Sequence, residues 1–268
     1  MKKSGVINII SNKNYDSIKT AEILTDKLEN AGFIIPNKYD DNAELNICIG
    51  GDGAFLRTVH NHNFSSIPYV GINTGHLGFF QEILPDKIDD FIENYINGSY
   101  LIEEIFLVEA IVYTKKNSFK LLGINEIVIK GIESKAVHMD IYIEDNHLEK
   151  FSGDGIIIST PAGSTAYNYS SGGCIVYPTL RTLQLTPLSP INSKAYRSLL
   201  NSAIIPGDMT IKVEPEYKYE SSILIINDGV QNTYDDIVKI SFKMSDTTIF
   251  RLVFDKDMYW NNLKSKFL

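Results

Sequence analysis

The sequence predicts an α/β N-terminal domain with a parallel sheet, followed by a β-rich C-terminal domain. In the first hundred residues, short apolar runs alternate with helical patterns, which is typical of a parallel sheet flanked by helices. After residue 99 apolar and polar residues alternate with a period of two, as they do in strands. The chain has 268 residues, 44% of them hydrophobic, and this is enough for two domains of ordinary size.

The N-terminal half carries both strand and helix signals. "GVINII" (5–10) predicts a buried strand, and the next segment predicts a helix with Asp16 as its N-cap and Gly32 as its stop. "LNICI" and "IPYVGI" repeat the strand signal. "PDKIDDFIENYING" has Pro85 near its start and Gly98 at its end, and this order predicts a further helix.

The rest of the chain is predicted to be mostly strands. The strand pattern is clearest in "FLVEAIVYT", "AVHMDIYIED", "TIKVEPEYKY" and "KISFKM". The tail "DKDMYWNNLKSKFL" is helical in character. We therefore predict an α/β domain over residues 1–98, a β-rich domain over 99–255, and a tail, 256–268, that packs back on the first domain.

Charge and cysteine content limit the classes of function. The chain has 25 Lys plus Arg against 33 Asp plus Glu, a net charge of −8 and no basic cluster, which argues against a nucleic-acid partner. Only Cys48 and Cys174 occur, with no C-x-x-C pair, so we expect no disulfide framework, no zinc knuckle and a reducing cytoplasm. The first residues carry only a short apolar run, and no run reaches 18 apolar residues, so we expect neither a signal peptide nor a membrane partner.

The stretch "ICIGGDGAFLRTVH" (47–60) places Asp52 among three glycines, after a predicted strand and before a predicted helix. Ligands of open α/β sheets bind at the carboxyl ends of strands. Glycine lets the backbone approach a ligand closely, and a helix start supplies unpaired N–H groups. The junction therefore predicts a phosphate or ribose cradle, although Asp52 taken alone is equally well explained as a helix N-cap.

Neither of the two familiar nucleotide-binding fingerprints occurs in this chain. There is no G-x-x-x-x-G-K-[ST] loop, and no G-x-G-x-x-G follows a predicted strand. A net acidic protein must hold a polyphosphate with backbone N–H groups, a few local cations or a metal. We therefore expect Mg²⁺ to arrive with such a substrate.

A second stretch, "GDGIIISTPAGSTAYNYSSGG" (153–173), again ends an apolar strand in small residues. Their hydroxyls can form hydrogen bonds with the polar atoms of a ligand. Tyr167 either stacks its ring on a base or is an ordinary core residue. Between the two stretches, Asn125 and Glu126 interrupt the apolar run "LLGINEIVIKG". A buried carboxylate needs partners, so Glu126 has donors inside the protein or receives them from ligand hydroxyls. The alternative is a polar pair that only organises strand ends.

In this order, GGDG, NTGHLGFF, NE and GDG…STPAGSTAYNYSSGG resemble the NAD kinase family. The resemblance covers residues 45–255 and also the tail with Trp260. It implies an α/β and a β-rich domain with the nucleotide bound between them. It also implies the reaction: ATP or polyphosphate, with a divalent metal, phosphorylates the 2′-hydroxyl of the adenosine ribose of NAD to give NADP.

The resemblance further implies a role for each site residue. Asp52 would accept a hydrogen bond from the 2′-hydroxyl and act as general base, with Gly53 contributing backbone close by. Asn125 and Glu126 would hold the hydroxyls of the nicotinamide-bearing ribose. In the family Asp154 mostly reaches into a neighbouring subunit's site, where it would touch adenine. The other implied pocket residues are Phe79, Thr165, Ala166, Tyr167, Ser170, Ser189 and Gly229.

Some positions depart from the family pattern. Ala54 stands where Thr is frequent, Ser152 where arginine is common, Tyr169 where Leu or Lys is common, and Gly229 has no side chain to contact a ligand. These departures concern donor preference and affinity rather than the reaction. The sequence also leaves open which donor is preferred, whether NADH is accepted and whether NADP(H) feeds back.

Two other functions remain as alternatives. A GGDG-type lipid kinase would need an apolar substrate slot, and it would have no need of Asn125 and Glu126. A non-catalytic NAD-binding sensor would use Asp52 only as a cap. For an NAD kinase, the resemblance implies a homotetramer or homodimer with shared sites.

Overall fold

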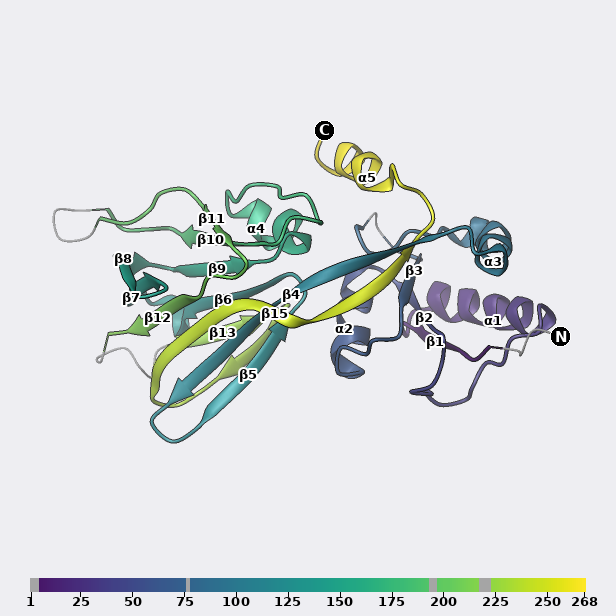
Figure 1. The fold of residues 1–268 in the computed structure, drawn as a ribbon, viewed down its shortest axis with the longest axis horizontal. Coiled ribbons are helices and arrows are strands. Elements are labelled where there is room, and N and C mark those ends of the chain that lie inside the picture. Colours follow the sequence, from purple (N-terminus) through teal and green to yellow (C-terminus); the bar gives the residue numbers. More distant parts are fainter. Residues whose placement is uncertain (1–4, 76–77, 193–196, 217–222) are drawn as a thin grey trace. The chain divides into compact units, whose positions relative to one another are not determined.

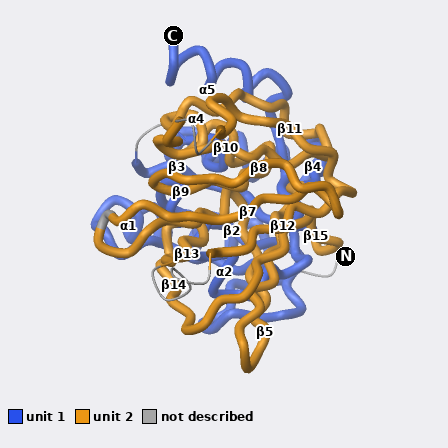
Figure 2. Tube along the Cα trace, turned by 90° about the vertical axis from the view of Figure 1, so that its left-hand side faces the viewer, with its two compact units in different colours: residues 1–104, 248–268 blue, residues 105–247 orange. Residues whose placement is uncertain are grey.

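A computed structural model describes residues 5–75, 78–192, 197–216 and 223–268. The chain divides into two compact units, residues 1–104 with 248–268 (unit 1) and residues 105–247 (unit 2), as Figure 2 shows. Two long strands, β4 (Leu101–Thr114) and β15 (Ile237–Val253), carry the chain from one unit to the other. The limits inferred from the sequence, 98/99 and 255/256, assign both of these strands to the second domain.

Unit 1 is built on a parallel sheet (Figure 1). Its strands are β1 (Ile7–Ser11), β2 (Leu45–Gly50), β3 (Tyr69–Asn73) and the end of β15, in this order. All pairs are parallel, and Arg251 of β15 pairs with Tyr69. Every residue of β2 and β3 is buried, as expected for apolar strands covered on both faces.

Helices accompany this sheet, as the alternating pattern predicts. They are α1 (Tyr15–Asn30), α2 (Asp52–Asn61), a 3₁₀ turn η1 (Pro85–Lys87), α3 (Ile88–Asn97) and α5 (Met258–Phe267). Apolar residues of α1 and α3 pack with the strands in a core that includes Leu24, Ile47, Ile72 and Phe91. None of the helices in the described part of the chain is long and apolar enough to cross a membrane.

The ends of the helices follow local sequence signals, with one correction. Asn14, not Asp16, is the N-cap of α1, because its side chain accepts the N–H of Ser17 at 2.8 Å. Asp16 already lies in the first helical turn, where a negative charge also favours the helix start. The helix predicted from Pro85 to Gly98 is confirmed: η1 begins at Pro85, and α3 ends at Asn97 with Gly98, at φ +67°, as its C-cap.

Unit 2 is rich in antiparallel strands, which confirms the predicted fold class. One sheet has the order β11 (Ala203–Pro206), β10 (Thr182–Leu188), β9 (Gly155–Ser159), β6 (Glu126–Gly131), β13 (Ile223–Asn227) and β14 (Val230–Thr233). The other strands are β5 (Ser118–Gly123), β7 (Val137–Ile143), β8 (Asn146–Gly153) and β12 (Ile211–Pro215), with the unit's parts of β4 and β15.

The strands of unit 2 enclose a large apolar core. Phe151, Ile156, Leu185 and Phe242 belong to it and are each 0% exposed. Short helical turns lie outside this core: η2 (Ile132–Ser134), η3 (Ala162–Thr165) and α4 (Tyr167–Ser170). The turns η3 and α4 follow the end of β9, so the stretch of small residues predicted to bind a ligand lies at a strand end.

Candidate active site

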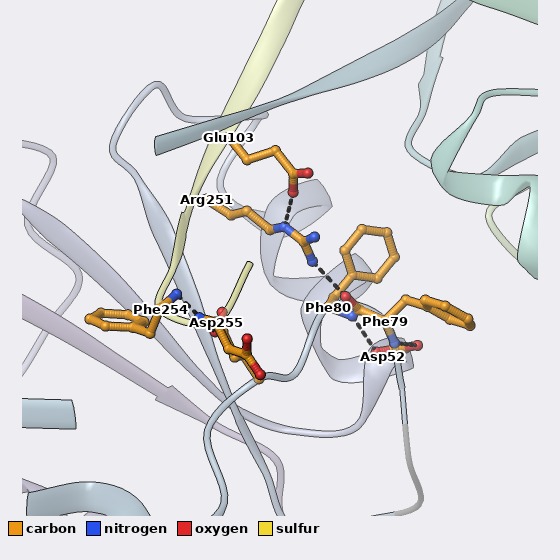
Figure 3. A network of polar contacts seen from close by, with 8 residues as sticks. Asp52, Phe79, Phe80, Glu103, Arg251, Phe254 and Asp255 are labelled. Atoms are coloured by element: carbon orange, nitrogen blue, oxygen red, sulfur yellow. Dashed lines mark hydrogen bonds and ion pairs between the residues drawn. The ribbon is translucent and has the colours of Figure 1, made fainter. Parts of the chain in front are cut away.

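Asp52 is the first residue of α2, close behind the end of β2. Its Oδ2 accepts the backbone N–H of Phe79 at 2.9 Å, and its Oδ1 accepts that of Phe80 at 3.0 Å (Figure 3). Gly51 is the N-cap of α2, and no side chain caps this helix. The interpretation of Asp52 as a helix N-cap is therefore wrong, since its carboxylate is held by a loop distant in sequence.

Close packing explains two glycines near Asp52, Gly78 and Gly50. A Cβ at Gly78 would lie 2.1 Å from Asp52 Oδ1, and a Cβ at Gly50 would lie 2.6 Å from that of Ala54. A Cβ at Gly51, by contrast, would meet nothing within 4 Å, and Gly53 is exposed. The glycines thus let backbone press against the carboxylate on one side and leave open space on the other.

Phe79 packs its ring against α5. The ring lies 5.8 Å from that of Tyr259 and 6.1 Å from that of Phe267, and the ammonium of Lys266 is 5.0 Å from its centroid. Only 9% of Phe79 is exposed. His76 and Leu77, which belong to the same sequence motif, lie outside the described residues.

The backbone of this loop is also held by charged side chains (Figure 3). Arg251 donates from Nη1 to the carbonyl of Phe79, and its Nε forms an ion pair with Glu103. Glu82 accepts the N–H groups of Phe254 at 2.8 Å and Asp255 at 2.6 Å. Burial raises the pKa of Glu82, and these two hydrogen bonds and the Arg251 charge oppose that rise.

The polar pair of unit 2 is fixed by a third carboxylate. Asp228, in the turn between β13 and β14, accepts the backbone N–H groups of Ile124 at 2.7 Å, Asn125 at 2.7 Å and Glu126 at 3.2 Å. Asn125 and Glu126 are 8% and 7% exposed. Burial first, and then the Asp228 charge, raise the pKa of Glu126 to about 8.

Two buried acceptors of this pair are unsatisfied. Asn125 Oδ1 and Glu126 Oε2 have no hydrogen-bond partner among the described residues. Buried polar groups in proteins are almost always hydrogen-bonded, so each such exception requires an explanation. Ligand hydroxyls, which can both donate and accept hydrogen bonds, would satisfy both atoms.

The small residues after β9 lie directly against Asn125. The hydroxyl of Thr160 donates to the carbonyl of Ile124 at 2.6 Å and accepts the N–H of Gly163 at 3.1 Å. A Cβ at Gly163 would lie 2.0 Å from the Asn125 carbonyl oxygen. The structure thus brings two predicted site segments together, the Asn125–Glu126 pair and the turn after β9.

Residues 165–170 form a partly exposed surface, which the buried side chain of Asn168 holds in place. Thr165 is buried, Ala166 is half-buried, Ser170 is exposed, and Tyr167 is 40% exposed. The interpretation of Tyr167 as a core residue is therefore wrong. Asn168 anchors this turn: its Oδ1 accepts from Thr186, and its Nδ2 donates to the carbonyls of Ser164 and Cys174.

Of the three remaining predicted site residues, one lies beside the Asn125–Glu126 pair and two lie at the other end of β6. Gly229, with φ +84°, adjoins Asp228 in the turn beside the pair. Asp154 is exposed, and its carbonyl accepts the N–H of Gly131, at the opposite end of β6 from Glu126. Ser189 follows Leu188, whose partner is Gly155, so it lies at the same end as Asp154. Within one chain, the structure does not bring Asp154 and Ser189 to the Asn125–Glu126 pair.

Three residues that organise these sites were not predicted from the sequence. Asp228 had a signal, because an Asp-Gly pair at a strand end predicts a turn, but only the glycine was singled out. Arg251 also had a weak signal as a charge in the apolar strand "IFRLVF". Asn262, whose Nδ2 donates to the carbonyl of Gly78 at 2.8 Å, had none, because nothing in the helical tail indicates which residue is buried.

Family models match both units of the chain. The ATP-NAD kinase N-terminal domain matches residues 6–100, and the ATP-NAD kinase C-terminal domain matches residues 124–249. Among curated proteins, an NAD kinase of Finegoldia magna is 51% identical over 270 residues, which cover 99% of this chain and 98% of that protein. An NAD kinase of Staphylococcus carnosus is 29% identical and covers 97% of both chains.

Solved structures show the same fold at low sequence identity. Yeast NADH kinase, complexed with NADH, matches with a TM-score of 0.85 at 18% identity, over 99% of this chain and 88% of the other. An NAD kinase from Archaeoglobus fulgidus, in complex with ATP, matches with a TM-score of 0.75 at 20% identity, over 97% and 99%. On the family models and the full-length relative that is half identical, the chain belongs to the NAD kinase family.

Proposed function

We propose that this chain transfers a phosphoryl group from ATP or polyphosphate to the 2′-hydroxyl of the adenosine ribose of NAD, giving NADP. Family membership supports the reaction. The observation that carries it in this chain is the Asp52 carboxylate, fixed at a strand end by two N–H groups and bordered at Gly51 by open space.

In this proposal Asp52 is the general base. Each carboxylate oxygen has two lone-pair sites and uses one on the loop N–H groups, so a site remains for a ribose hydroxyl. Phosphoryl transfer passes through a loose transition state, so the base mainly orients the hydroxyl and takes its proton late. A carboxylate held at both oxygens provides that orientation, because positioning contributes most of the catalysis in such reactions.

The pair Asn125 and Glu126 binds the hydroxyls of the nicotinamide-bearing ribose in this proposal. Their unsatisfied buried oxygens support this role, since ribose hydroxyls supply the missing hydrogen-bond partners. Tyr167 stacks on adenine with its exposed ring. The remaining binding residues are proposed from the family resemblance: Gly53, Phe79, Thr165, Ala166, Ser170, Ser189 and Gly229, with Asp154 acting in a neighbouring subunit's site.

We propose that a divalent cation, Mg²⁺, arrives bound to the phosphoryl donor. The described residues contain no group of three or more His, Cys, Asp or Glu side chains placed to hold a metal ion. Mg²⁺ is usually bound by one or two carboxylates together with substrate phosphates, so a donor-borne ion needs few protein ligands. A competing role for Asp52 is that of such a ligand.

We also propose a cytoplasmic homo-oligomer, a tetramer or dimer with shared sites. Cys48 and Cys174 are both free thiols, which suits a reducing compartment. The exposed position of Asp154, away from its own chain's Asn125–Glu126 pair, suits a role in another subunit. Light scattering at working concentration tests the assembly, and a monomer would contradict it.

The deciding experiment measures NADP formation from NAD, ATP and Mg²⁺ by the parent and by Asp52→Asn. The amide keeps the size of the side chain but removes the charge, and we expect the folded variant to lose turnover by a factor on the order of 10² to 10⁴. Near-parent turnover of a folded Asp52→Asn would refute the base. A raised Mg²⁺ requirement in the variant would indicate metal ligation instead.

The same assay separates the alternatives. Inorganic polyphosphate replaces ATP in one arm, and a diacylglycerol or sphingoid acceptor replaces NAD in another. Phosphorylation of the lipid but not of NAD would indicate a lipid kinase. NAD binding without turnover with either donor would indicate a non-catalytic sensor.

A further inference from the structure

Two consecutive peptide groups connect the C-terminal part of the chain with Asp52. In the peptide between Gly78 and Phe79, the carbonyl accepts Asn262 Nδ2 at 2.8 Å, and the N–H donates to Asp52 Oδ2 at 2.9 Å. In the next peptide, the carbonyl of Phe79 accepts Arg251 Nη1, and the N–H of Phe80 donates to Asp52 Oδ1 at 3.0 Å. Each carboxylate oxygen is thus held by one peptide, and each of these peptides is held by one C-terminal side chain.

The planar peptide group couples the hydrogen bond at its carbonyl to the hydrogen bond at its N–H. The described chain has no cis peptide bond, and in a trans peptide the C=O and N–H point in opposite directions. A donor at the carbonyl therefore fixes the direction in which the N–H points. Hydrogen bonds in such a chain also polarise one another, so a cationic donor strengthens the bond on the far side of the peptide.

Both C-terminal side chains are themselves firmly placed. Asn262 lies on α5 and is 7% exposed. The side chain of Arg251 is 13% exposed and is also paired with Glu103, as Figure 3 shows. The ring of Phe79 lies against Tyr259, Phe267 and Lys266 of the same helix α5.

We infer that Arg251 and Asn262 are positioning residues that orient the Asp52 carboxylate through the peptides of Gly78 and Phe79. This inference rests on the proposed function, because it takes Asp52 as the group that receives the 2′-hydroxyl. It makes the C-terminal segment, more than 190 residues after Asp52, part of the machinery that sets the reaction rate.

Loss of either donor should affect turnover more than binding. A carboxylate that rotates out of line with the hydroxyl loses the near-attack geometry, and misplacement by about 1 Å can cost on the order of 100-fold in rate. NAD binding draws on many other contacts. We therefore expect Asn262→Ala to lower kcat about ten-fold to 100-fold while KM for NAD and the directly measured Kd stay at the parent values.

The chain offers a matched control beside Asn262. Asn261 is its neighbour on α5, has the same side chain and is exposed, so Asn261→Ala should keep the parent kcat. Arg251→Lys and Arg251→Gln form a second pair of variants. Lysine retains the charge, but its single ammonium group cannot contact Glu103 and the Phe79 carbonyl as the planar guanidinium does. We therefore expect the kcat of Arg251→Lys to lie between those of the parent and Arg251→Gln. Thermal unfolding of each variant gives the fraction folded, to which kcat is normalised.

A double-mutant cycle distinguishes positioning from plain structural support. If Asn262 acts through Asp52, Asn262→Ala should cost little further turnover in an Asp52→Asn background. An equal loss of kcat in both backgrounds would overturn the inference, as would parent kcat in a folded Asn262→Ala. A parent that forms no NADP contradicts the proposed function, and the inference falls with it; an active parent with an unaffected Asn262→Ala contradicts the inference alone.

Discussion

The carboxylate of Asp228 accepts the backbone N–H of Asn125 at 2.7 Å, so the turn between β13 and β14 fixes the start of β6. The same carboxylate also holds the N–H groups of Ile124 and Glu126. Asp52 in unit 1 holds two N–H groups in a similar way but borders open space at Gly51. The two aspartates are bonded in a similar way but have different roles. Asp52 has open space beside it in which a ligand can bind, whereas Asp228 holds the backbone of the Asn125–Glu126 pair in place.

Asp228→Asn should destabilise the protein. An amide has one acceptor oxygen in place of two, so at least one of the buried N–H groups of residues 124–126 loses its partner, at a cost of about 1–3 kcal/mol in the free energy of unfolding. Asp228 has φ +45°, a conformation that asparagine also tolerates, so the substitution tests the side chain rather than the backbone. Urea denaturation measures the loss.

Asp246→Asn is the control for this prediction. Its side chain is 97% exposed and pairs only with Lys243 among the ion pairs of the described chain, so its removal should leave the free energy of unfolding nearly unchanged. Equal midpoints for the two variants would show that Asp228 does not support the turn as described.

Glu126→Gln should stabilise the ligand-free protein increasingly as the pH rises. The folded pKa of about 8 lies above the ordinary value of 4.5, so between these values the unfolded chain has released a proton that the folded chain still holds. The contribution of Glu126 to the free energy of unfolding must then fall as pH rises from 4.5 to 8, because this group binds fewer protons in the unfolded state. Glutamine carries no such proton, and the variant escapes that loss.

The measurement is urea denaturation of the parent and Glu126→Gln at pH 5 and pH 8. The free energy of unfolding of Glu126→Gln minus that of the parent should be larger at pH 8 than at pH 5. Glu104→Gln, at an exposed position, should show no such widening. Parallel pH curves for the parent and Glu126→Gln would contradict the raised pKa.

Tyr167→Ala should weaken NAD binding with little effect on stability. The ring is 40% exposed, so its removal leaves no large cavity. A base stacked on an aromatic ring contributes about 1–3 kcal/mol, so we expect Kd for NAD to rise about ten-fold. Calorimetric titration with NAD measures the change.

Tyr169→Ala is the matched control. Tyr169 is 39% exposed and lies two residues further along α4, where the side chain points to a different side of the helix. Its loss should change Kd less than that of Tyr167. The same Kd for both variants and the parent would exclude stacking on Tyr167.

The sequence predicted the parts of the site that depend on local pattern. Asp52 could be placed at a strand end because the apolar run before it and the glycines around it are neighbours in the chain. The partners of its carboxylate could not be predicted, because Phe79 and Phe80 bind it through backbone N–H groups that every residue but proline possesses.

Local competition explains the misplaced cap of α1. Asn14 and Asp16 are both good capping residues two positions apart, and the sequence does not decide between them. Asp228 shows the complementary limit, since its bonds to Asn125 and Glu126 join residues 103 and 102 positions apart. Residue types indicate what can bond, whereas only the fold decides which distant groups meet.

Gly163→Ala should disturb both stability and NAD binding, because the turn after β9 and the Asn125 backbone cannot both keep their places. The new Cβ would lie 2.0 Å from the Asn125 carbonyl oxygen, and that oxygen also accepts the N–H of Thr160 at 2.9 Å. Overpacking of this kind costs about 1–3 kcal/mol in the free energy of unfolding. Gly53→Ala is the stability control, since Gly53 lies inside α2 and its Cβ would meet only the end of the Arg57 side chain, at 3.4 Å. A Gly163→Ala protein as stable as Gly53→Ala, with the parent Kd for NAD, would show that Gly163 does not hold Asn125 in place.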